Sequence, residues 1–300
     1  MEAPPTLPDG PCDPESAGFT RFGPVVPDCP VVLAVPHAGR DYPPALHDAV
    51  RGPIERLVAL EDRLVDRLVE PLAARGMTTF VANTARAWID LNRDERELDP
   101  AMVLPPPSPE RLIASARVRG GLGLIPRRLA GLGDVWLGAF GAEDVAARIG
   151  QLHRPYHAAL ARSLGAARTR FGAAVLLDCH SMPSLGVQPG SPPSPTFVVG
   201  DRHGRSASAR LVAIVEAAAR SAGLRASRNA PYAGGHTLDR HGQPGRGIHA
   251  IQIEIDRKLY LDREGHEIGE GAAAITALIE DIVGRLADAL LNGQLPVAAE

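Results

Sequence analysis

The chain has 300 residues, of which 45% are hydrophobic and 22% are charged, so it carries enough apolar material to bury a core. This composition argues against a disordered chain, a collagen or a coiled coil. The formal charge of −3 comes from 32 basic and 35 acidic residues that are spread along the chain. Because no basic stripe is present to neutralise phosphates, we expect no nucleic-acid partner.

The cysteines and the N-terminus indicate the compartment. The three cysteines form no C-x-x-C pair, which predicts neither a disulfide framework nor a thiolate zinc site and fits a reducing compartment. Residues 1–25 are rich in proline and glycine and lack the features of a secretory signal, so we expect an irregular segment there. No uncharged apolar run approaches the ~20 residues that span a bilayer. We therefore expect a cytoplasmic protein without a membrane partner, and the sequence leaves its oligomeric state open.

In the first half of the chain, apolar patterns predict two strands and one helix. In chain order we expect a strand over 30–35, a helix over 57–74, a strand over 77–82, a polar loop over 92–100 and an extended segment over 102–109. The first strand is a β-branched run that ends at Pro36-His37. The helix has apolar residues at helical spacing and acidic residues near its start. The last segment contains three consecutive prolines, which cannot continue a helix.

In the second half of the chain, strands again alternate with helices. We expect a helix over 142–168, strands over 171–177 and 195–199, a helix over 206–222, a strand over 249–255 and a helix over 271–291. The first of these helices should bend near Pro155. Apolar strands that alternate with helices are typical of a largely parallel sheet. We therefore predict a single α/β domain over 26–295, with three layers: a mostly parallel mixed sheet and helices on both of its faces.

Polar residues at the ends of the predicted strands are the candidates for a site, because ligands of open α/β sheets bind beyond the carboxyl ends of the strands. They are His37, the loop from Asp90 to Arg93, His180, and Glu254 within the last strand. Two histidines and one carboxylate would form the three-ligand zinc site of a hydrolase. A nearby carboxylate that is not a ligand would take a proton from water. The alternative is that each histidine is a hydrogen-bonded loop residue.

A set of short motifs occurs here in the order in which it occurs in the N-formylglutamate amidohydrolase family, and over about residues 30 to 264 the chain resembles that family. The motifs are Val35-Pro36-His37-Ala38-Gly39, Glu61-Asp62, Asp90-Leu91-Asn92-Arg93, Pro155-Tyr156-His157, Leu177-Asp178-Cys179-His180-Ser181-Met182-Pro183, Gly200-Asp201-Arg202-His203-Gly204, Pro231-Tyr232-Ala233-Gly234-Gly235 and His249-Ala250-Ile251-Gln252-Ile253-Glu254. The family is similar to zinc carboxypeptidases and to aspartoacylase. The resemblance implies one zinc ion and hydrolysis of N-formyl-L-glutamate to formate and L-glutamate, a reaction of histidine catabolism.

The resemblance also implies the metal ligands. His37 and His180 match the two zinc-ligand histidines of the family. The carboxylate ligand is less defined, because the relatives that use H-x-x-E have glutamate where this chain has arginine. The resemblance implies that in this family an acid of the predicted helix replaces that glutamate as the carboxylate ligand. We favour Asp62 for this position, with Glu61 and Asp66 as alternatives. The alternative is that these three acids lie on an exposed helix face and bind no metal.

Three further residues match family positions that contact the substrate or carry a proton. Glu254 matches the general base, and a carboxylate inside an apolar strand is costly unless it is paired or used. Asn92 and Arg93 match the pair that binds the substrate's α-carboxylate in the desuccinylase-like relatives. Arg86 is a second candidate for that contact, or else it forms a surface salt bridge. Asp178 lies two residues before the second ligand histidine, so it would orient that ring or cap a turn.

Several alternatives stay open. After Gly234-Gly235 the chain continues His236-Thr237-Leu238-Asp239-Arg240-His241-Gly242, which departs from the family's Thr-Arg-His-Tyr-Gly-like run. The substrate would then be another N-acyl amino acid or a peptide, or the chain would be a catalytically silent amino-acid-binding protein. Nickel, cobalt or manganese would also suit histidine and carboxylate ligands. His153 and His157 have the spacing of H-E-x-x-H metalloproteases but lack the glutamate.

Overall fold

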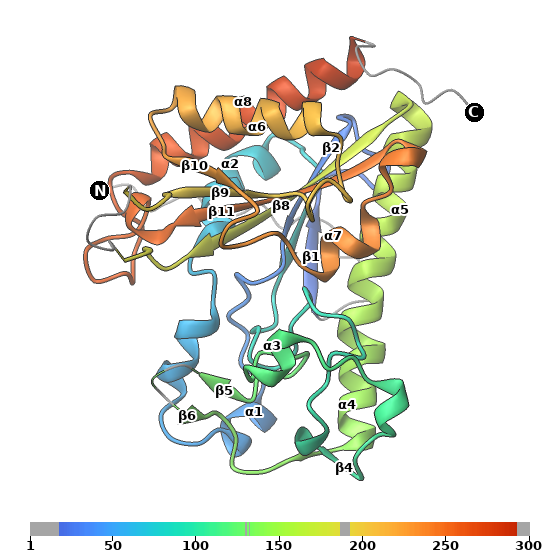
Figure 1. The fold of residues 1–300 in the computed structure, drawn as a ribbon, viewed down its shortest axis with the longest axis vertical. Coiled ribbons are helices and arrows are strands. Elements are labelled where there is room, and N and C mark those ends of the chain that lie inside the picture. The colour runs from blue at the N-terminus through green and yellow to red at the C-terminus, as the bar shows by residue number, and fades with distance from the viewer. Residues whose placement is uncertain (1–17, 130, 132, 187–192, 293–300) are drawn as a thin grey trace.

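The computed structural model describes residues 18–129, 131, 133–186 and 193–292, and its centre is a seven-stranded sheet (Figure 1). In spatial order the strands are β1 (Phe19–Phe22), β3 (Thr79–Ala82), β2 (Val31–Val35), β8 (Ala174–Met182), β11 (Ile248–Asp256), β9 (Phe197–Gly200) and β10 (Ala226–Arg228). Strands β3, β2, β8 and β11 run parallel, whereas β1 is antiparallel to β3 and β9 is antiparallel to β11. The prediction of a mixed, mostly parallel sheet is confirmed.

Helices cover both faces of this sheet (Figure 1). One face carries α2 (Val65–Ala74), α6 (Ala209–Ser221) and α8 (Ala272–Leu291), and the other carries α5 (Arg154–Phe171) and α7 (His236–His241). Because side chains alternate along a strand, Leu177 and Cys179 of β8 pack under the first group of helices while Leu176 packs under the second. Burial on both faces explains why the central strands are continuous apolar runs in the sequence. The predicted three-layer α/β architecture is confirmed.

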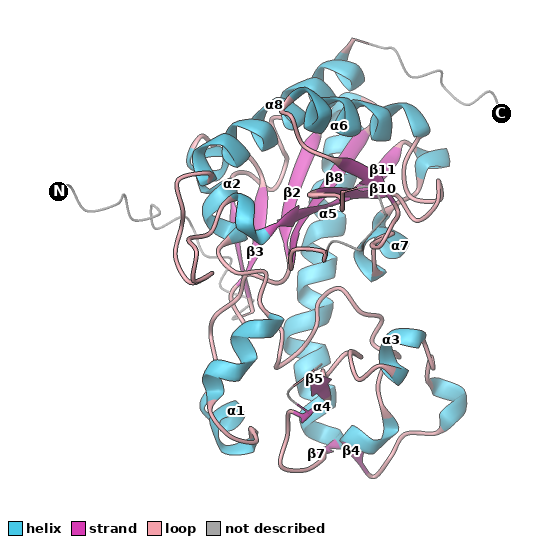
Figure 2. Ribbon diagram, turned by 60° about the vertical axis from the view of Figure 1, so that its left-hand side comes forward, coloured by secondary structure: helices cyan, strands magenta, loops and turns pink. Residues whose placement is uncertain are grey.

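A smaller lobe follows the carboxyl ends of β2 and β3 (Figure 2). Its elements are α1 (Pro44–Ala49), η1 (Ile54–Leu60), η2 (Pro100–Met102), β4 (Val103–Leu104), η3 (Pro109–Arg111), α3 (Ala116–Arg119), β5 (Arg128–Leu129), β6 (Gly133–Asp134), β7 (Phe140–Gly141) and α4 (Ala142–Arg148). Helix α4 continues through the π-helical turn η4 (Ile149–His153) into α5, so one long helix links the lobe to the sheet. The short helices η5 (Pro244–Arg246) and η6 (Arg257–Leu259) flank β11.

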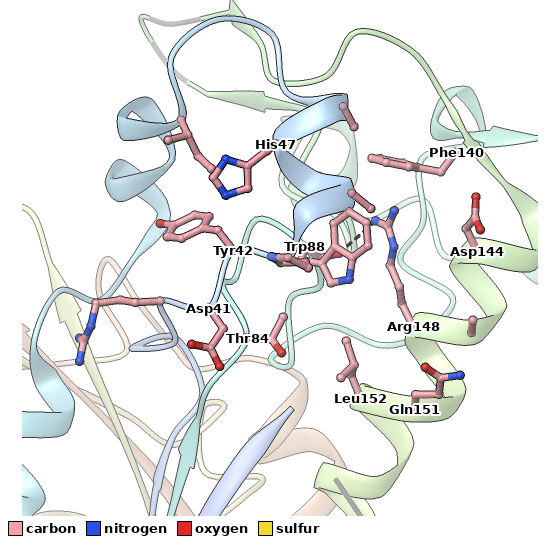
Figure 3. A pocket seen from close by; sticks show the side chains of 16 residues that line it. Asp41, Tyr42, His47, Thr84, Trp88, Phe140, Asp144, Arg148, Gln151 and Leu152 are labelled. Carbon is pink, nitrogen blue, oxygen red and sulfur yellow. Dashed lines mark hydrogen bonds between the residues drawn. The ribbon is translucent and has the colours of Figure 1, made fainter. Parts of the chain in front are cut away.

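Contacts between an arginine of α4 and two aromatic rings hold α4 against the rest of this lobe. The Arg148 guanidinium lies 3.2 Å from the centroid of the Trp88 ring and 3.9 Å from that of Phe140. These side chains line a cavity of about 940 Å³, and Tyr42 and His47 form part of the opposite wall (Figure 3). The described residues that line this cavity include none of the predicted site residues, so the candidate site lies elsewhere.

The predicted helix over 57–74 is two elements with a break between them. The 3-10 helix η1 ends at Leu60, and α2 begins only at Val65. Leu64 has a positive φ of 59°, and the backbone N–H of Asp62 donates to the carbonyl oxygen of His37 at 2.9 Å. Apolar periodicity does not encode such a contact between distant segments. As a result, Asp62 leaves the helix and lies at the end of the sheet.

Strands β8 and β1 also differ from the predictions. Strand β8 starts at Ala174 rather than 171 and continues past Leu177 to Met182, because β2 and β11 pair with it on either side. Strand β1 lies within residues 1–25, where we expected an irregular segment, and its Phe19 packs edge-on against Tyr156 with ring centroids 5.5 Å apart. Because β1 belongs to the main sheet, the folded unit begins before residue 26. Residues 1–17 lie outside the described part of the chain.

None of the helices in the described residues combines the length and the apolar composition needed to cross a bilayer.

Candidate metal centre and active site

The candidate site lies at the carboxyl ends of the central parallel strands. His37 follows β2, and His180 and Glu254 lie opposite each other in the parallel register of β8 and β11. In the same register Asp178 lies opposite Gln252. Because side chains two residues apart share a face of a strand, these four side chains of β8 and β11 emerge on one face of the sheet.

His37, Asp62 and His180 form a compact buried cluster. The Asp62 Oδ2 atom lies 2.8 Å from His180 Nδ1 and 3.3 Å from His37 Nδ1. The two imidazole rings meet edge to face, with their centroids 4.7 Å apart. The exposed fractions of the three residues are only 2–3%. The break between η1 and α2 is what brings the carboxylate to the two histidines.

Two further carboxylates fix the orientation of the histidine rings. His37 Nε2 donates to Asp90 Oδ1 at 2.7 Å, and His180 Nε2 donates to Asp178 Oδ2 at 3.0 Å. An ionised carboxylate only accepts hydrogen bonds, so each Nε2 carries a proton; with a metal ion in place of the proton between His180 Nδ1 and Asp62, both rings would present their Nδ1 lone pairs to that ion. His37 Nδ1 is buried and makes no hydrogen bond among the described residues.

This donor set fits a divalent transition metal. Two imidazole nitrogens and one carboxylate oxygen are typical ligands of a catalytic zinc ion, which keeps one position open. The hydrogen bonds from the ligand rings to Asp90 and Asp178 are the outer contacts that metal-binding histidines usually make. The Nδ1 atom of His37 makes no hydrogen bond and lies 3.3 Å from Asp62 Oδ2, within the group that could hold an ion.

The electrostatics of the cluster favour a cation. Burial alone would raise the pKa of Asp62, but His180 and His37 hold it well below its usual range. Burial alone would lower the pKa of His180, but Asp178 and Asp62 raise it well above its usual value. The cluster therefore retains positive charge between the rings and the carboxylates, as a proton or as a metal ion.

Glu254 lies on the neighbouring strand with one oxygen engaged and a perturbed acidity. Gln252 Nε2 donates to Glu254 Oε1 at 2.8 Å, which leaves the second oxygen for another partner. Burial raises the pKa of Glu254 to about 8. A carboxyl group with a raised pKa beside a candidate metal centre is suited to transfer protons.

The two alternative acids of the 61–66 region are engaged elsewhere. Glu61 accepts from the Tyr42 hydroxyl and from Arg63 Nη1, the latter at 3.0 Å. Asp66 forms two hydrogen bonds with Arg40, at 2.9 and 2.6 Å. Of the three acids that we considered as ligands, Asp62 is the one that lies against both histidines.

Asn92 and Arg93 face the interior of the protein. Asn92 Oδ1 accepts from the backbone N–H of Thr237 at 2.9 Å, and its Nδ2 lies 3.3 Å from His180 Nε2. Arg93 donates from Nε to the Leu122 carbonyl oxygen and from Nη1 to its neighbour's carbonyl, each at 2.8 Å. Both side chains therefore support the loop that carries Asp90.

Two other arginines present free donors beside the cluster. Arg86 donates from Nε to Asp90 Oδ2 at 2.9 Å, its side chain is 17% exposed, and its Nη atoms have no partner among the described residues. Arg257 donates from Nε to the Ser181 hydroxyl at 3.1 Å, and its Nη2 lies 3.4 Å from Asp62 Oδ1. Neither Arg257 nor the hydrogen bond from His37 to Asp90 was among the predictions. Arg257 directly follows β11, so the rule that selected His37 would also have selected it.

Comparisons with known proteins point in one direction. The model of the N-formylglutamate amidohydrolase family matches residues 29–261. N-formylglutamate deformylase of Pseudomonas aeruginosa is 29% identical over 78% of this chain and 83% of its own length. The deformylase of Pseudomonas putida is 30% identical over 78% of this chain and 82% of its own length. The crystal structure of N-formylglutamate amidohydrolase from Ralstonia eutropha JMP134 is 34% identical, with a TM-score of 0.83 over 92% of this chain and 99% of that chain.

Proposed function

The chain belongs to the N-formylglutamate amidohydrolase family, and we propose that it hydrolyses N-formyl-L-glutamate to formate and L-glutamate. One observation carries the proposal. The buried cluster of His37, Asp62 and His180 lies beside Glu254 at the carboxyl ends of the central strands. In a chain of this family, that arrangement supports metal-dependent hydrolysis of an amide.

We propose that His37 Nδ1, Asp62 Oδ2 and His180 Nδ1 bind one zinc ion. When bound, the ion supplies Lewis-acid chemistry, which polarises a carbonyl group and lowers the pKa of water. Asp90 and Asp178 keep the Nδ1 lone pairs of the histidines available by accepting their Nε2 protons. The chemistry of the donor set supports zinc, and metal analysis tests that assignment.

Glu254 moves the proton. Its free carboxylate oxygen takes a proton from the attacking water, whose oxygen adds to the formyl carbon. Glu254 then gives this proton to the nitrogen of the leaving amino group as the C–N bond breaks, which yields formate and L-glutamate. Gln252 orients the carboxylate by donating to Oε1. Positive charge from the bound ion and from Arg86 favours the carboxylate form, which burial alone disfavours.

Arg86 and Arg257 are the best-placed cations for the two carboxylates of N-formyl-L-glutamate. Each guanidinium keeps one or more Nη atoms without a partner in the described residues, and each lies beside a residue of the cluster or its support. A planar guanidinium binds a carboxylate through parallel hydrogen bonds, which orients the scissile amide. In this arrangement Asn92 and Arg93 support the site from behind instead of contacting the substrate.

A substrate panel with a matched variant tests the proposal. We expect release of formate from N-formyl-L-glutamate and slower turnover of N-acetyl-L-glutamate and N-formyl-L-methionine. Glu254→Gln should retain bound zinc and lose activity about 10²- to 10⁴-fold, the usual contribution of general acid–base catalysis. Full activity in this variant would remove Glu254 from the mechanism. Turnover of another N-acyl amino acid alone would change the substrate, and zinc binding without any turnover would favour an amino-acid-binding protein. The cytoplasmic location and the place in histidine catabolism stay predictions.

A further inference from the structure

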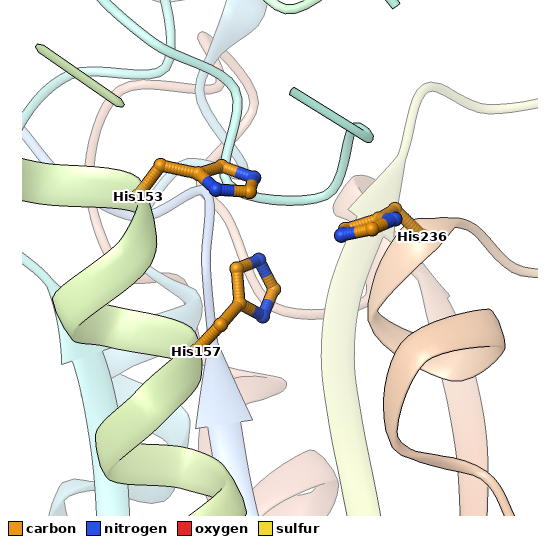
Figure 4. A group of neighbouring side chains, drawn as sticks. All are labelled: His153, His157 and His236. Atoms are coloured by element: carbon orange, nitrogen blue, oxygen red, sulfur yellow. The ribbon is translucent and has the colours of Figure 1, made fainter. Parts of the chain in front are cut away.

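Three histidines outside the candidate active site meet at the junction of the long helix and α7 (Figure 4). His153 ends the π-helical turn η4, His157 lies one turn further along in α5, and His236 begins α7 and faces them. One ring nitrogen from each histidine lies within 4.8 Å of the other two. His153 and His157 are fully buried, and the His236 side chain is 11% exposed.

Backbone carbonyl groups fix which ring nitrogens are protonated. His153 Nε2 donates to the Arg93 carbonyl oxygen at 2.8 Å, and His157 Nε2 donates to the Leu91 carbonyl oxygen at 2.9 Å. A carbonyl oxygen only accepts, so each Nε2 carries the proton of its neutral ring. The Nδ1 atoms of both rings are therefore lone-pair donors, which is the form that binds metal ions.

Two nitrogens of the cluster have no hydrogen-bond partner. His153 Nδ1 and His236 Nε2 are both buried, and neither makes a hydrogen bond within the described residues. Burying a polar atom without a hydrogen-bond partner destabilises the folded protein. Because such atoms are rare in folded proteins, two of them in one cluster call for a ligand.

The histidines are neutral, which suits a metal better than a proton. Burial lowers the pKa of His236 to about 4, and it lowers that of His153 below its usual value. Burial and the neighbouring His153 hold the pKa of His157 well below its usual range. An ion that binds here near neutral pH would therefore not have to displace protons from the rings.

A cavity of about 380 Å³ provides a route to the cluster. His236 forms part of its wall, together with the carboxylates of Asp94 and Glu97. Asp94 Oδ2 lies 3.9 Å from His236 Nδ1, on the side of the ring opposite the unpartnered Nε2. At this distance the carboxylate does not hydrogen-bond the ring, but its negative charge would favour a cation bound by His236.

We propose that His153, His157 and His236 bind a second divalent transition-metal ion, with the unpartnered His153 Nδ1 and His236 Nε2 as two of its ligand atoms. Three imidazole nitrogens select zinc, nickel, cobalt or copper over magnesium and calcium, which prefer oxygen ligands. Water would complete the coordination. On the side towards His241, His157 Nδ1 accepts a hydrogen bond from His241 Nε2 at 3.0 Å.

The second ion would stabilise the loop that supports the proposed catalytic centre. The histidines hold this loop through the carbonyl groups of Leu91 and Arg93, while the side chains of Asp90 and Asn92 contact His37 and His180. An ion that holds the histidines in place would therefore also hold the loop that carries Asp90 and Asn92. The ion in this site takes no part in the chemistry, so the proposal does not depend on the substrate.

Zinc stoichiometry tests the second site. We would strip the full-length protein with a chelator, titrate it with zinc against a chromophoric competitor and count the ions bound per chain. We expect two ions for the wild type and one each for His236→Ala and His180→Ala. The control His47→Ala removes an exposed histidine of α1 and should bind two. One ion in the wild type, or two in His236→Ala, would overturn the proposal.

A second measurement avoids any dependence on the folding of His236→Ala. In the His180→Ala variant the proposed catalytic centre lacks a ligand, so zinc should still raise its Tm through the second site. Further replacement of His236 by glutamine, which keeps a polar side chain at this position, should abolish that increase. No effect of zinc on the Tm of His180→Ala would contradict the second site. Loss of formate release in His180→Ala reports on the proposed function separately.

Discussion

Replacing Asp90 by asparagine tests the outer contacts of the proposed metal centre. Asp90 is fully buried, and its oxygens accept from His37 Nε2 at 2.7 Å, from the Asn92 backbone N–H at 2.8 Å and from Arg86 Nε at 2.9 Å. Asparagine has the same shape, but it has no charge and only one acceptor oxygen. Whichever way its amide is turned, either His37 or Arg86 loses its acceptor.

Both the zinc affinity and the stability should fall. Losing the carboxylate that orients a ligand histidine typically weakens metal binding about 10- to 100-fold. Removing one partner of a buried ion pair costs about 3–5 kcal/mol, and we expect the lower end because the Arg86 side chain is partly exposed. A competitive zinc titration measures the affinity, and urea unfolding of the metal-free protein measures the free energy of unfolding.

Asp66→Asn is the matched control. Asp66 forms an ion pair with Arg40 near the surface and does not contact the histidines, so this variant should keep the zinc affinity of the wild type. If Asp90→Asn bound zinc as tightly as the wild type and unfolded at the same urea concentration, the proposed role of Asp90 would be refuted.

Three further predictions follow from the same geometry. Arg257→Met should retain zinc and lower kcat/KM for N-formyl-L-glutamate about 10- to 150-fold, because a hydrogen bond to a charged group contributes about 1.5–3 kcal/mol; an unchanged kcat/KM would exclude contact with the substrate. Arg86→Met should lower kcat/KM for N-formyl-L-glutamate to a similar extent. One of the two arginines should bind the side-chain carboxylate of the substrate, and replacing that arginine should also reduce the preference for N-formyl-L-glutamate over N-formyl-L-glutamine, measured as the ratio of the two kcat/KM values. Burial alone would raise the pKa of Asp90, but Arg86 and Arg93 hold it well below its usual range. The ionised Asp90 therefore contributes its full stabilisation of the fold above about pH 4, and this contribution is lost as the pH falls through the pKa of Asp90 in the folded protein. The metal-free wild type should therefore lose more stability than Asp90→Asn between pH 6 and 3, and equal losses in urea unfolding would count against this assignment.

The sheet could be predicted from the sequence because its central strands are buried on both faces. The runs that became β2, β8 and β11 are apolar for most of their length, and the polar residues at their ends pointed to His37 and His180. Helix α8 was predicted from one apolar face for the same reason. Local apolar patterns were sufficient to predict those strands and helices whose burial can be read from their own sequence.

The remaining features depend on contacts between distant segments. The break before α2 rests on a hydrogen bond from Asp62 to His37, and the apolar spacing of residues 57–74 continues across it. The role of Asp90 depends on a ring 53 positions earlier in the chain. Arg93 matched a substrate-binding position of the relatives, yet its Nε and Nη1 donate to backbone carbonyls and its Nη2 lies 3.6 Å from Asp90 Oδ2, which only the folded loop reveals. Pairing partners of this kind leave no periodic signal in a single sequence.

Formate release before and after metal removal tests the central claim most directly. The protein would be assayed with N-formyl-L-glutamate as purified, after exhaustive chelation, and after zinc is returned, with His180→Ala treated in parallel. We predict that chelation abolishes formate release, that zinc restores it in the wild type, and that zinc does not restore it in His180→Ala. Undiminished activity after complete metal removal would contradict a metal centre at His37, Asp62 and His180.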